Sequence, residues 1–317
     1  MDRIPEIALE WHRAGKGAAL ATVVRTWGSA PRRVGSQLVI SGAGEIEGSV
    51  SGGCVEGAVI VEAIDALEDG APKLLTFGVS DDEAFAVGLA CGGEIAVLVE
   101  PVGKAMPEDM LADLVAARAA RQPIAYHVNT ASWARSLSTD NSDDRFRMDR
   151  SGFEEDTFIA INNPPLRMAV IGAVHITQPL VQMARMAGYD PFIIDPREIF
   201  GSEARFPGEM LSNEWPDEAL TAWGIDARTA VVTLSHDPKI DDPALHVALK
   251  SDAFYIGALG STRTHAKRLA RLTEAGFSDA DIARIHAPVG LDIGAASPAE
   301  IAIATLAQIT GVLRGRA

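Results

Sequence analysis

One short stretch concentrates the residues that could do chemistry. Gly48-Ser-Val-Ser-Gly-Gly-Cys-Val-Glu-Gly-Ala58 holds four glycines, two serines and a cysteine. Glycine lets a ligand approach the backbone closely. From Val55 onward the apolar residues follow helical spacing, so Cys54 is expected at a helix N-terminus, where free N–H groups and the helix dipole favour a thiolate. The alternative is a glycine-rich turn with a small buried cysteine, and the density of glycines favours the chemical interpretation.

Further groups with chemical potential lie in the same third of the chain. Arg32 and Arg33 are adjacent in a turn-rich loop, and a second cysteine, Cys91, stands within Gly88-Leu-Ala-Cys-Gly-Gly93. Soft thiolate ligands suit transition metals and sulfur chemistry, and arginine forks suit phosphate. C-x-x-C, H-E-x-x-H and G-x-S-x-G do not occur, so neither a dedicated zinc site nor a serine hydrolase is expected.

A βαβ pattern in the second half resembles one half of a dinucleotide-binding fold. Gly172 takes the place of the first glycine of G-x-G-x-x-G, but Val174 stands where the second should let a pyrophosphate lie against the backbone. His175 follows this turn, either facing the crevice above the sheet or serving as a hydrogen-bonded structural residue. Asp195, followed by Arg197, either accepts ribose hydroxyls or belongs to an Asp-Pro turn.

Three later segments also border the expected crevice. Residues 235–238 and 257–263 follow predicted strands, and the second of these has glycine, serine and arginine at a helix start, which is a reasonable anion cradle. The apolar loop 286–294 is expected to pack against the rest of the domain and to line the same crevice. Each of the first two segments could instead be an ordinary connection between strand and helix.

Composition limits the classes of partner. The net charge of −15 and the pI near 4.9 argue against nucleic acid and anionic membrane surfaces, although a local pocket can still be basic and take a phosphorylated ligand. The chain shows neither an export signal at its start nor an apolar run of about 18 residues. Two cysteines are too few for a disulfide scaffold, so a cytoplasmic protein with reduced thiols is expected.

The elements expected from the pattern give an α/β fold in two domains and a connection. Residues 1–105 are predicted to form an N-terminal mixed α/β domain, and 106–165 a connecting segment with a helix and a hairpin. Within that segment, 137–145 are expected to be a solvated hairpin loop. Residues 166–317 alternate strand and helix, which predicts a Rossmann-like, doubly wound parallel sheet.

With these motifs laid out, nearly the full chain resembles the XdhC/CoxI family, maturation factors of molybdenum hydroxylases such as xanthine dehydrogenase. In the first half the resemblance rests on 28–33, 48–56 and 88–93, and the Ser-Gly-Gly-Cys-Val-Glu stretch is highly specific. In the second half it rests on four segments: 195–197, 205–207, 257–261 and 286–294. One departure concerns the first Rossmann turn, which in the family is usually Gly-Ala-Gly-His and here is Gly172-Ala-Val-His175.

The resemblance implies binding of a molybdopterin-type molybdenum cofactor, often in its dinucleotide form, and its delivery to an apo-hydroxylase. It also implies exchange of an oxo for a sulfido ligand together with a cysteine desulfurase, and a homodimer. Cys54 is then expected to be the reactive thiol. The other residues expected to bind the cofactor are Arg32, Arg33, Ser51, Gly52, Gly53, Glu56, Cys91, Gly172, His175, Asp195 and Arg197.

Two alternatives stay open at this point. The second domain could make the protein an NAD(P)-dependent oxidoreductase, which Val174 argues against. The chain could also be a scaffold that binds the hydroxylase without a cofactor. The resemblance favours cofactor handling over turnover of a metabolite.

Overall fold

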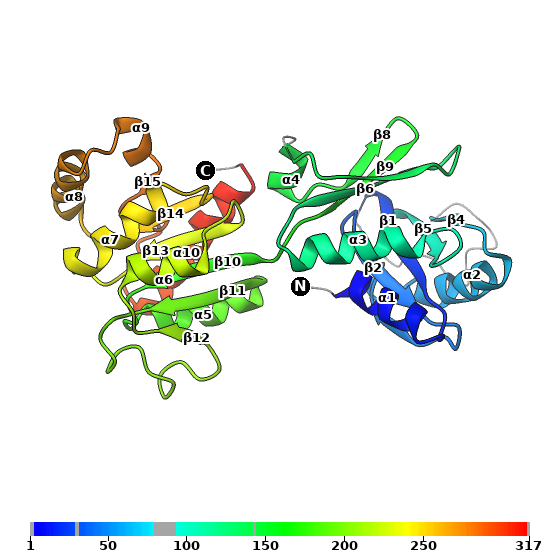
Figure 1. Cartoon of the computed structure of the whole chain (residues 1–317), viewed down its shortest axis with the longest axis horizontal. Coiled ribbons are helices and arrows are strands. Elements are labelled where there is room, and N and C mark those ends of the chain that lie inside the picture. Colours follow the sequence, from blue (N-terminus) through cyan, green and yellow to red (C-terminus); the bar gives the residue numbers. More distant parts are fainter. Residues whose placement is uncertain (1–2, 29–31, 79–92, 142–143, 316–317) are drawn as a thin grey trace. The chain divides into compact units, whose positions relative to one another are not determined.

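The computed structural model describes residues 3–28, 32–78, 93–141 and 144–315 (Figure 1). Contacts divide the chain into two compact units, Met1–Pro164 and Pro165–Ala317. In the described part of the chain, no helix is both long and apolar enough to span a bilayer.

The first unit is built on a sheet of five described strands in the order β3-β2-β1-β5-β4, with antiparallel pairing throughout. These strands are β1 (Ala19–Trp27), β2 (Gln37–Ile40), β3 (Ile46–Gly48), β4 (Lys73–Phe77) and β5 (Glu94–Pro101). Alternate residues of β1 face opposite sides, so that Ala19, Ala21 and Val23 pack under helix α2 (Glu56–Asp69). The expected N-terminal mixed α/β architecture is therefore present.

The other face of this sheet is covered by helices α1 (Ile4–Arg13) and α3 (Glu108–Ala119) and by a second antiparallel sheet. That sheet has the order β7-β6-β9-β8, with β6 (Ile124–Asn129), β7 (Arg135–Ser138), β8 (Gly152–Glu154) and β9 (Thr157–Asn162). Leu111, Tyr126 and Phe158 from this part share one core with Leu20 of β1. Residues 106–164 thus belong to the first unit by their packing.

The solvated loop expected over 137–145 is shorter than predicted: residues 139–141 are exposed and lie outside any strand or helix, but the ends of the segment are regular structure. Leu137 and Ser138 pair with β6 as part of β7, and a short helix α4 (Asp144–Met148) begins at the far end of the segment. Phe146 of α4 is buried against Ala125 and Ile159. Phe146, one residue beyond the predicted segment, anchors α4, because burial of an aromatic ring stabilises by ~2 kcal/mol.

The second unit carries a parallel sheet of six described strands in the order β12-β11-β10-β13-β14-β15. The strands are β10 (Leu166–Ile171), β11 (Tyr189–Ile194), β12 (Met210–Ser212), β13 (Thr229–Thr233), β14 (Tyr255–Ala258) and β15 (Ile285–His286). Numbered within the unit, this is the order 3-2-1-4-5-6 of the Rossmann fold. The predicted fold class is confirmed.

Helices cover both faces of this sheet, as the alternation of elements predicts. They are α5 (Thr177–Met186), α6 (Pro216–Trp223), α7 (Pro238–Leu249), α8 (Thr262–Glu274), α9 (Asp279–Ile282) and α10 (Pro298–Leu313). Leu180 and Ile309 bring α5 and α10 to one core, and Leu220, Leu245 and Leu272 bring α6, α7 and α8 to the other. The strand order reverses between β10 and β13, which is where such folds open a crevice.

Candidate functional site

The stretch with the most chemical potential forms the connection between β3 and α2. At Gly48 the backbone has φ 90°, and a Cβ there would collide with the carbonyl oxygen of Gln37 and approach Ile4 within 2.8 Å. Glycine is therefore required for the chain to leave β3 in this direction. At the other end of the loop, Val55 and Val59 pack on the sheet, so α2 holds the loop at a defined place.

Glu56, the first residue of α2, fills the loop with its own carboxylate. Oε1 accepts hydrogen bonds from the N–H groups of residues 50, 51 and 52 at 2.9–3.2 Å, and from the Ser49 hydroxyl at 2.8 Å. Oε2 accepts from the Gly53 N–H at 2.9 Å and from the Ser51 hydroxyl. Four successive backbone donors thus point at one internal anion, in the manner of an anion-binding nest.

The hydroxyl of Ser51 completes this arrangement. It donates to Glu56 and accepts from the N–H groups of Cys54 and Val55 at 3.0 and 2.9 Å. A hydroxyl has one donor and two acceptor positions, so Ser51, which is 1% exposed, has no capacity left for a ligand. Ser51 and Glu56 therefore shape the loop from inside.

Electrostatics agree with this role for Glu56. Burial is the largest single influence and would raise the pKa of this carboxyl, but the hydrogen bonds from Ser51 and Ser49 together outweigh it and lower the pKa to about 2. The side chain is an anion at every ordinary pH, and the loop donors are already satisfied.

The side chain of Cys54 lies on the solvent-exposed side of this loop. Its backbone N–H is bonded to Ser51, but its side chain is exposed and is not part of a disulfide. The neighbouring Gly52 and Gly53 are exposed and have φ values of 77° and 113°. A side chain on either glycine would be strained, and a Cβ at Gly53 would meet nothing within 4 Å. The expected alternative of a core cysteine is therefore wrong.

Of the two predicted arginines, Arg32 is the one that touches the loop. Its Nε donates to the carbonyl oxygen of Ser49 at 3.2 Å, while the Arg33 side chain is exposed. Cys91 and most of its glycine cluster lie outside the described residues. Within the described ranges, no three His, Cys, Asp or Glu residues are grouped so that they could hold a metal ion.

In the second unit, the turn after β10 packs tightly against the neighbouring connection after β13. Gly172 has φ 100°, and a Cβ there would lie 2.8 Å from the backbone nitrogen of Ser235, the residue that follows the neighbouring strand. Val174 packs against the core beneath α5, and His175 is exposed. The glycine therefore allows two connections to approach each other at the point where the strand order reverses.

Asp195 at the end of β11 is fully buried and already engaged. Its carboxylate accepts from the Ala173 N–H at 2.8 Å and from the backbone and guanidinium of Arg197 at 2.8–3.0 Å. Burial opposes ionisation most strongly, but the hydrogen bonds from Arg197 and Ala173 hold the pKa of Asp195 below its usual value. The structure thus joins the predicted residues 172, 195 and 197 into one cluster.

Sequence reasoning took Glu56 for a ligand-binding residue and did not foresee its place inside the loop. The available signal was the spacing: a glutamate three to five residues after a Ser-Gly-Gly turn, at the first position of a helix, can reach back to the loop donors.

The protein defined by these features is a two-unit α/β protein with an exposed thiol on a rigid loop and a Rossmann-type second unit. A family model described as "XdhC Rossmann domain" matches residues 168–309, and one described as "XdhC and CoxI family" matches residues 11–78. The chain belongs to the XdhC and CoxI family, which confirms the resemblance found in its motifs.

Similar proteins support this assignment. Molybdenum cofactor insertion chaperone PaoD from Escherichia coli (strain K12) is 31% identical over 309 residues, covering 98% of this chain and 87% of that protein. A protein of Bacillus subtilis (strain 168), named as a probable subunit of xanthine dehydrogenase, is 27% identical over 92% of each chain. A crystal structure described as a xanthine dehydrogenase from Bacillus halodurans superposes with a TM-score of 0.75 at 25% identity, covering 100% of this chain and 97% of that one.

Proposed function

We propose that this protein binds a molybdopterin-type molybdenum cofactor as cargo and passes it to an apo-molybdenum hydroxylase such as xanthine dehydrogenase. Membership of the family supports this, as do the names of two relatives, an insertion chaperone for the same cofactor and a probable component of xanthine dehydrogenase. A carrier must hold its cargo and release it, so a few exposed contacts suit the task better than a closed catalytic cavity.

The observation that carries the proposal is the exposed thiol of Cys54 on a loop whose other polar groups are satisfied internally. A thiolate is a soft ligand suited to a transition metal. Because Glu56 and Ser51 saturate the donors of the loop, Cys54 is held in place without competing for them. Cys54 is the metal-contacting group in this proposal, and Glu56 and Ser51 are positioning residues.

The phosphate of the cargo requires other partners. The N–H groups of residues 50–53 already bind the Glu56 carboxylate, so a second anion there would be repelled. Arg33 is exposed, and Arg32 lies against the loop through Ser49. We assign the phosphate contact to these two arginines, with Gly52 and Gly53 leaving room for the pterin and Cys91 as a second thiol.

The finer steps belong to the same proposal. A cysteine desulfurase would deliver the sulfur that replaces an oxo ligand of the cargo before transfer. The protein would act as a homodimer in the cytoplasm and could take the dinucleotide form of the cofactor. The cluster of Gly172, His175, Asp195 and Arg197 would then contribute to the nucleotide part.

Retention of released cofactor tests the central claim. Purified protein is incubated with cofactor from a denatured hydroxylase, passed through a desalting column, and the bound pterin is measured after oxidation to its fluorescent form. Wild-type protein should retain close to one equivalent, Cys54→Ala about tenfold less, and Glu47→Gln, on exposed β3, as much as wild type. If Cys54→Ala retains as much pterin as wild type, the thiol does not bind the cofactor.

Transfer is tested separately with apo-hydroxylase. Loaded wild-type protein should restore hydroxylase activity faster than the same amount of free cofactor. Arg33→Ala should load less cofactor while keeping the fold, because its side chain is exposed. If free cofactor reconstitutes the enzyme equally fast, the protein is not a delivery factor.

A further inference from the structure

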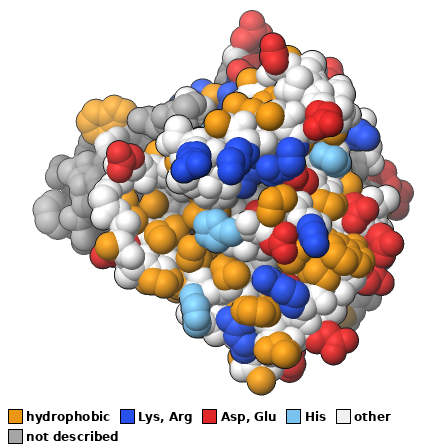
Figure 2. Space-filling model, turned by 90° about the vertical axis from the view of Figure 1, so that its left-hand side faces the viewer, with side chains coloured by type: hydrophobic (Ala, Val, Ile, Leu, Met, Phe, Trp, Pro, Cys, Tyr) orange, Lys and Arg blue, Asp and Glu red, His pale blue; other side chains and the backbone are white. Residues whose placement is uncertain are grey.

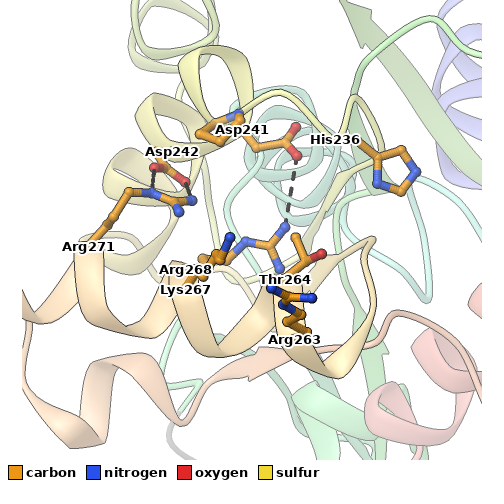
Figure 3. Close-up of a pocket in the computed structure, with 9 residues that line it drawn as sticks. His236, Asp241, Asp242, Arg263, Thr264, Lys267, Arg268 and Arg271 are labelled. Carbon is orange, nitrogen blue, oxygen red and sulfur yellow. Dashed lines mark hydrogen bonds and ion pairs between the residues drawn. The ribbon is translucent and has the colours of Figure 1, made fainter.

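A second polar site lies in the second unit, between the first turns of α7 and α8. It is a pocket of about 210 Å³ at the carboxyl edge of the parallel sheet (Figure 3). Its lining is formed by His236, Pro238, Asp241, Asp242, Arg263, Thr264, Lys267, Arg268 and Arg271.

Positive charge exceeds negative charge among these residues, although the whole chain carries −15. Arg271 is neutralised by Asp242, to which it donates two hydrogen bonds. Arg263 and Lys267 are exposed and form no ion pair with any residue that the structure describes. Figure 2, which faces the side where α7, α8 and α9 lie in Figure 1, shows Lys and Arg side chains gathered in a row.

Arg268 differs from the other basic residues of the pocket lining because it is buried. Its residue is 2% exposed, and Nη2 donates to the Leu259 carbonyl oxygen at 2.9 Å. Nε and Nη1 have no hydrogen-bond partner in the described structure. An ionised group buried with donors unsatisfied costs several kcal/mol, so such a guanidinium is expected to have a partner that the chain itself does not supply.

The Asp241 carboxylate pairs with Arg268 at long range and does not accept a hydrogen bond from Nε or Nη1. Asp241 Oδ2 forms an ion pair with Arg268 Nη2 at 3.9 Å, which the dashed line in Figure 3 marks, but this distance is too long for a hydrogen bond. The other oxygen, Oδ1, accepts from the Ser235 hydroxyl at 2.7 Å. Burial raises the pKa of Asp241, which further weakens it as a counter-ion.

The surroundings of Arg268 favour an anion from outside. Helices α7 and α8 both begin at the pocket, with Pro238 and Thr264 in its wall. Their first turns are capped by Asp237 and Ser261, so what they contribute is the positive end of the helix dipole. His236, at φ 64°, lines the pocket from the connection that precedes α7 (Figure 3). Arg263 and Lys267 stand on the same helix as Arg268, one turn apart.

We propose that this pocket is a binding site for the phosphate or diphosphate group of a small ligand, with Arg268 as its buried anchor and Arg263 and Lys267 at its mouth. The site is formed by residues of the second unit alone, whereas the Cys54 loop belongs to the first unit. Arginine donates charge-assisted hydrogen bonds to phosphate, and two nitrogens of Arg268, Nε and Nη1, have no hydrogen-bond partner in the described structure.

The size of the pocket restricts the ligand. Pockets that enclose a drug-sized molecule usually measure ~300–1,000 Å³, and this one measures about 210 Å³. It can hold an inorganic phosphate or diphosphate, or the phosphate end of a larger molecule whose remainder lies outside. The chemistry recognised is the same in each case.

Binding is measured on the full chain by calorimetry at low ionic strength, with phosphate, diphosphate and a nucleoside diphosphate as separate probes and chloride as the control anion. Diphosphate should bind at submillimolar concentration, raise the midpoint of thermal unfolding, and weaken as salt increases. No heat of binding and no thermal shift with any of the three phosphate probes would overturn the proposal.

Variants locate the site. Lys267→Ala and Arg263→Ala should each weaken diphosphate binding about fivefold to tenfold without loss of fold, because both side chains are exposed. Arg268→Met should weaken it about a hundredfold, and the exposed variants keep the test valid if this one misfolds. Lys239→Ala, exposed on α7 outside the pocket, should bind as wild type; equal loss in this control and in Lys267→Ala would reject a defined site.

The three probes also distinguish recognition of the phosphate group alone from recognition of a larger phosphorylated molecule. Tighter binding of the nucleoside diphosphate than of diphosphate would show that the ligand extends beyond the pocket. Equal binding would show that the phosphate group alone is recognised. Unchanged diphosphate binding in Cys54→Ala would confirm that the site is independent of the proposed cofactor loop.

Discussion

Two sites at helix starts in this molecule deal with an anion in opposite ways. At α2 the chain supplies its own carboxylate, Glu56, and four backbone N–H groups and two hydroxyls bind it. At α7 and α8 the chain gathers arginine and lysine, buries the Arg268 guanidinium, and leaves two of its nitrogens without a partner in the described structure.

This difference shows why a glycine-rich helix entry is not by itself an anion site. The loop before α2 has the expected glycines and donors, yet its binding capacity is used internally, and what it offers to the outside is a thiol. The pocket at α8 has fewer glycines but retains unsatisfied donors. Whether a helix start binds a ligand depends on which of its groups the fold has already satisfied.

Neutralising Glu56 should have the largest effect on stability. Glu56→Gln keeps the size of the side chain but removes the charge and turns one acceptor into a donor facing backbone N–H groups. We expect the free energy of unfolding of the first unit to fall by about 2–3 kcal/mol, or its thermal midpoint by roughly 5–10 °C. Glu47→Gln, on the exposed end of β3, is the matched control and should shift neither. A thermal midpoint unchanged in Glu56→Gln would contradict the internal-anion interpretation.

Acidification should reproduce part of this loss in the unmodified protein. The pKa of Glu56 is lowered in the folded state from 4.5 to about 2, so its stabilising contribution is complete above pH 4.5 and disappears as the pH falls toward 2. The stability difference between wild type and Glu56→Gln, measured by urea unfolding at a series of pH values, should therefore shrink across this range. A constant difference from pH 5 to pH 2 would show that charge is not the cause.

Removal of the buried cation should have a much smaller effect. Without ligand, Arg268→Met loses one hydrogen bond to Leu259 and the 3.9 Å ion pair with Asp241, but it also removes the cost of a buried charge with two nitrogens that lack hydrogen-bond partners. The thermal midpoint should change by an amount equivalent to about 1 kcal/mol or less. In diphosphate the wild type should gain stability and the variant should not. If Arg268→Met lowers the thermal midpoint as much as Glu56→Gln does, Arg268 is a structural ion-pair residue, and the contrast between the pocket and the α2 loop does not hold.

The smallest effect on stability is expected at Cys54. Its side chain is exposed, so Cys54→Ala should change the free energy of unfolding by about 0.5 kcal/mol or less. In the native protein, iodoacetamide should label this thiol, which peptide mass spectrometry distinguishes from Cys91. If Cys54 is labelled only after denaturation, it is not presented to a ligand as we propose.

Much of the fold could be predicted because local patterns and global packing agree. The apolar spacing after Val55 was sufficient to place α2 and the face that packs on the sheet. The alternation of strands and helices from Leu166 predicted the parallel sheet. The ends of the segment 137–145 were mispredicted because strand pairing with β6 at one end and the burial of Phe146 just beyond the other are tertiary contacts, which a polar sequence pattern does not reveal.

The candidate sites, like the fold, have features that the sequence predicts and features that it does not. Cys54 and its glycines could be singled out from residue types and spacing. The arginine and lysine positions 263, 267, 268 and 271 also repeat at helical spacing, and the turn 257–263 was a plausible anion cradle. The pattern could not tell that Arg268 points inward while Lys267 stays exposed, since neighbouring residues on a helix differ by ~100° in direction.

By itself, the sequence determined the alternating elements of the second unit, the glycine-rich entry to α2 and the position of the thiol on it, because these depend on short-range spacing and backbone freedom. Only the tertiary structure decided which groups remain available. Glu56 reaches the loop donors because α2 is held against the sheet. Two nitrogens of Arg268 lack hydrogen-bond partners in the described structure because the side chain is buried beside α7. Hydrogen-bond satisfaction is a property of atoms brought together from distant residues, and no local pattern contains it.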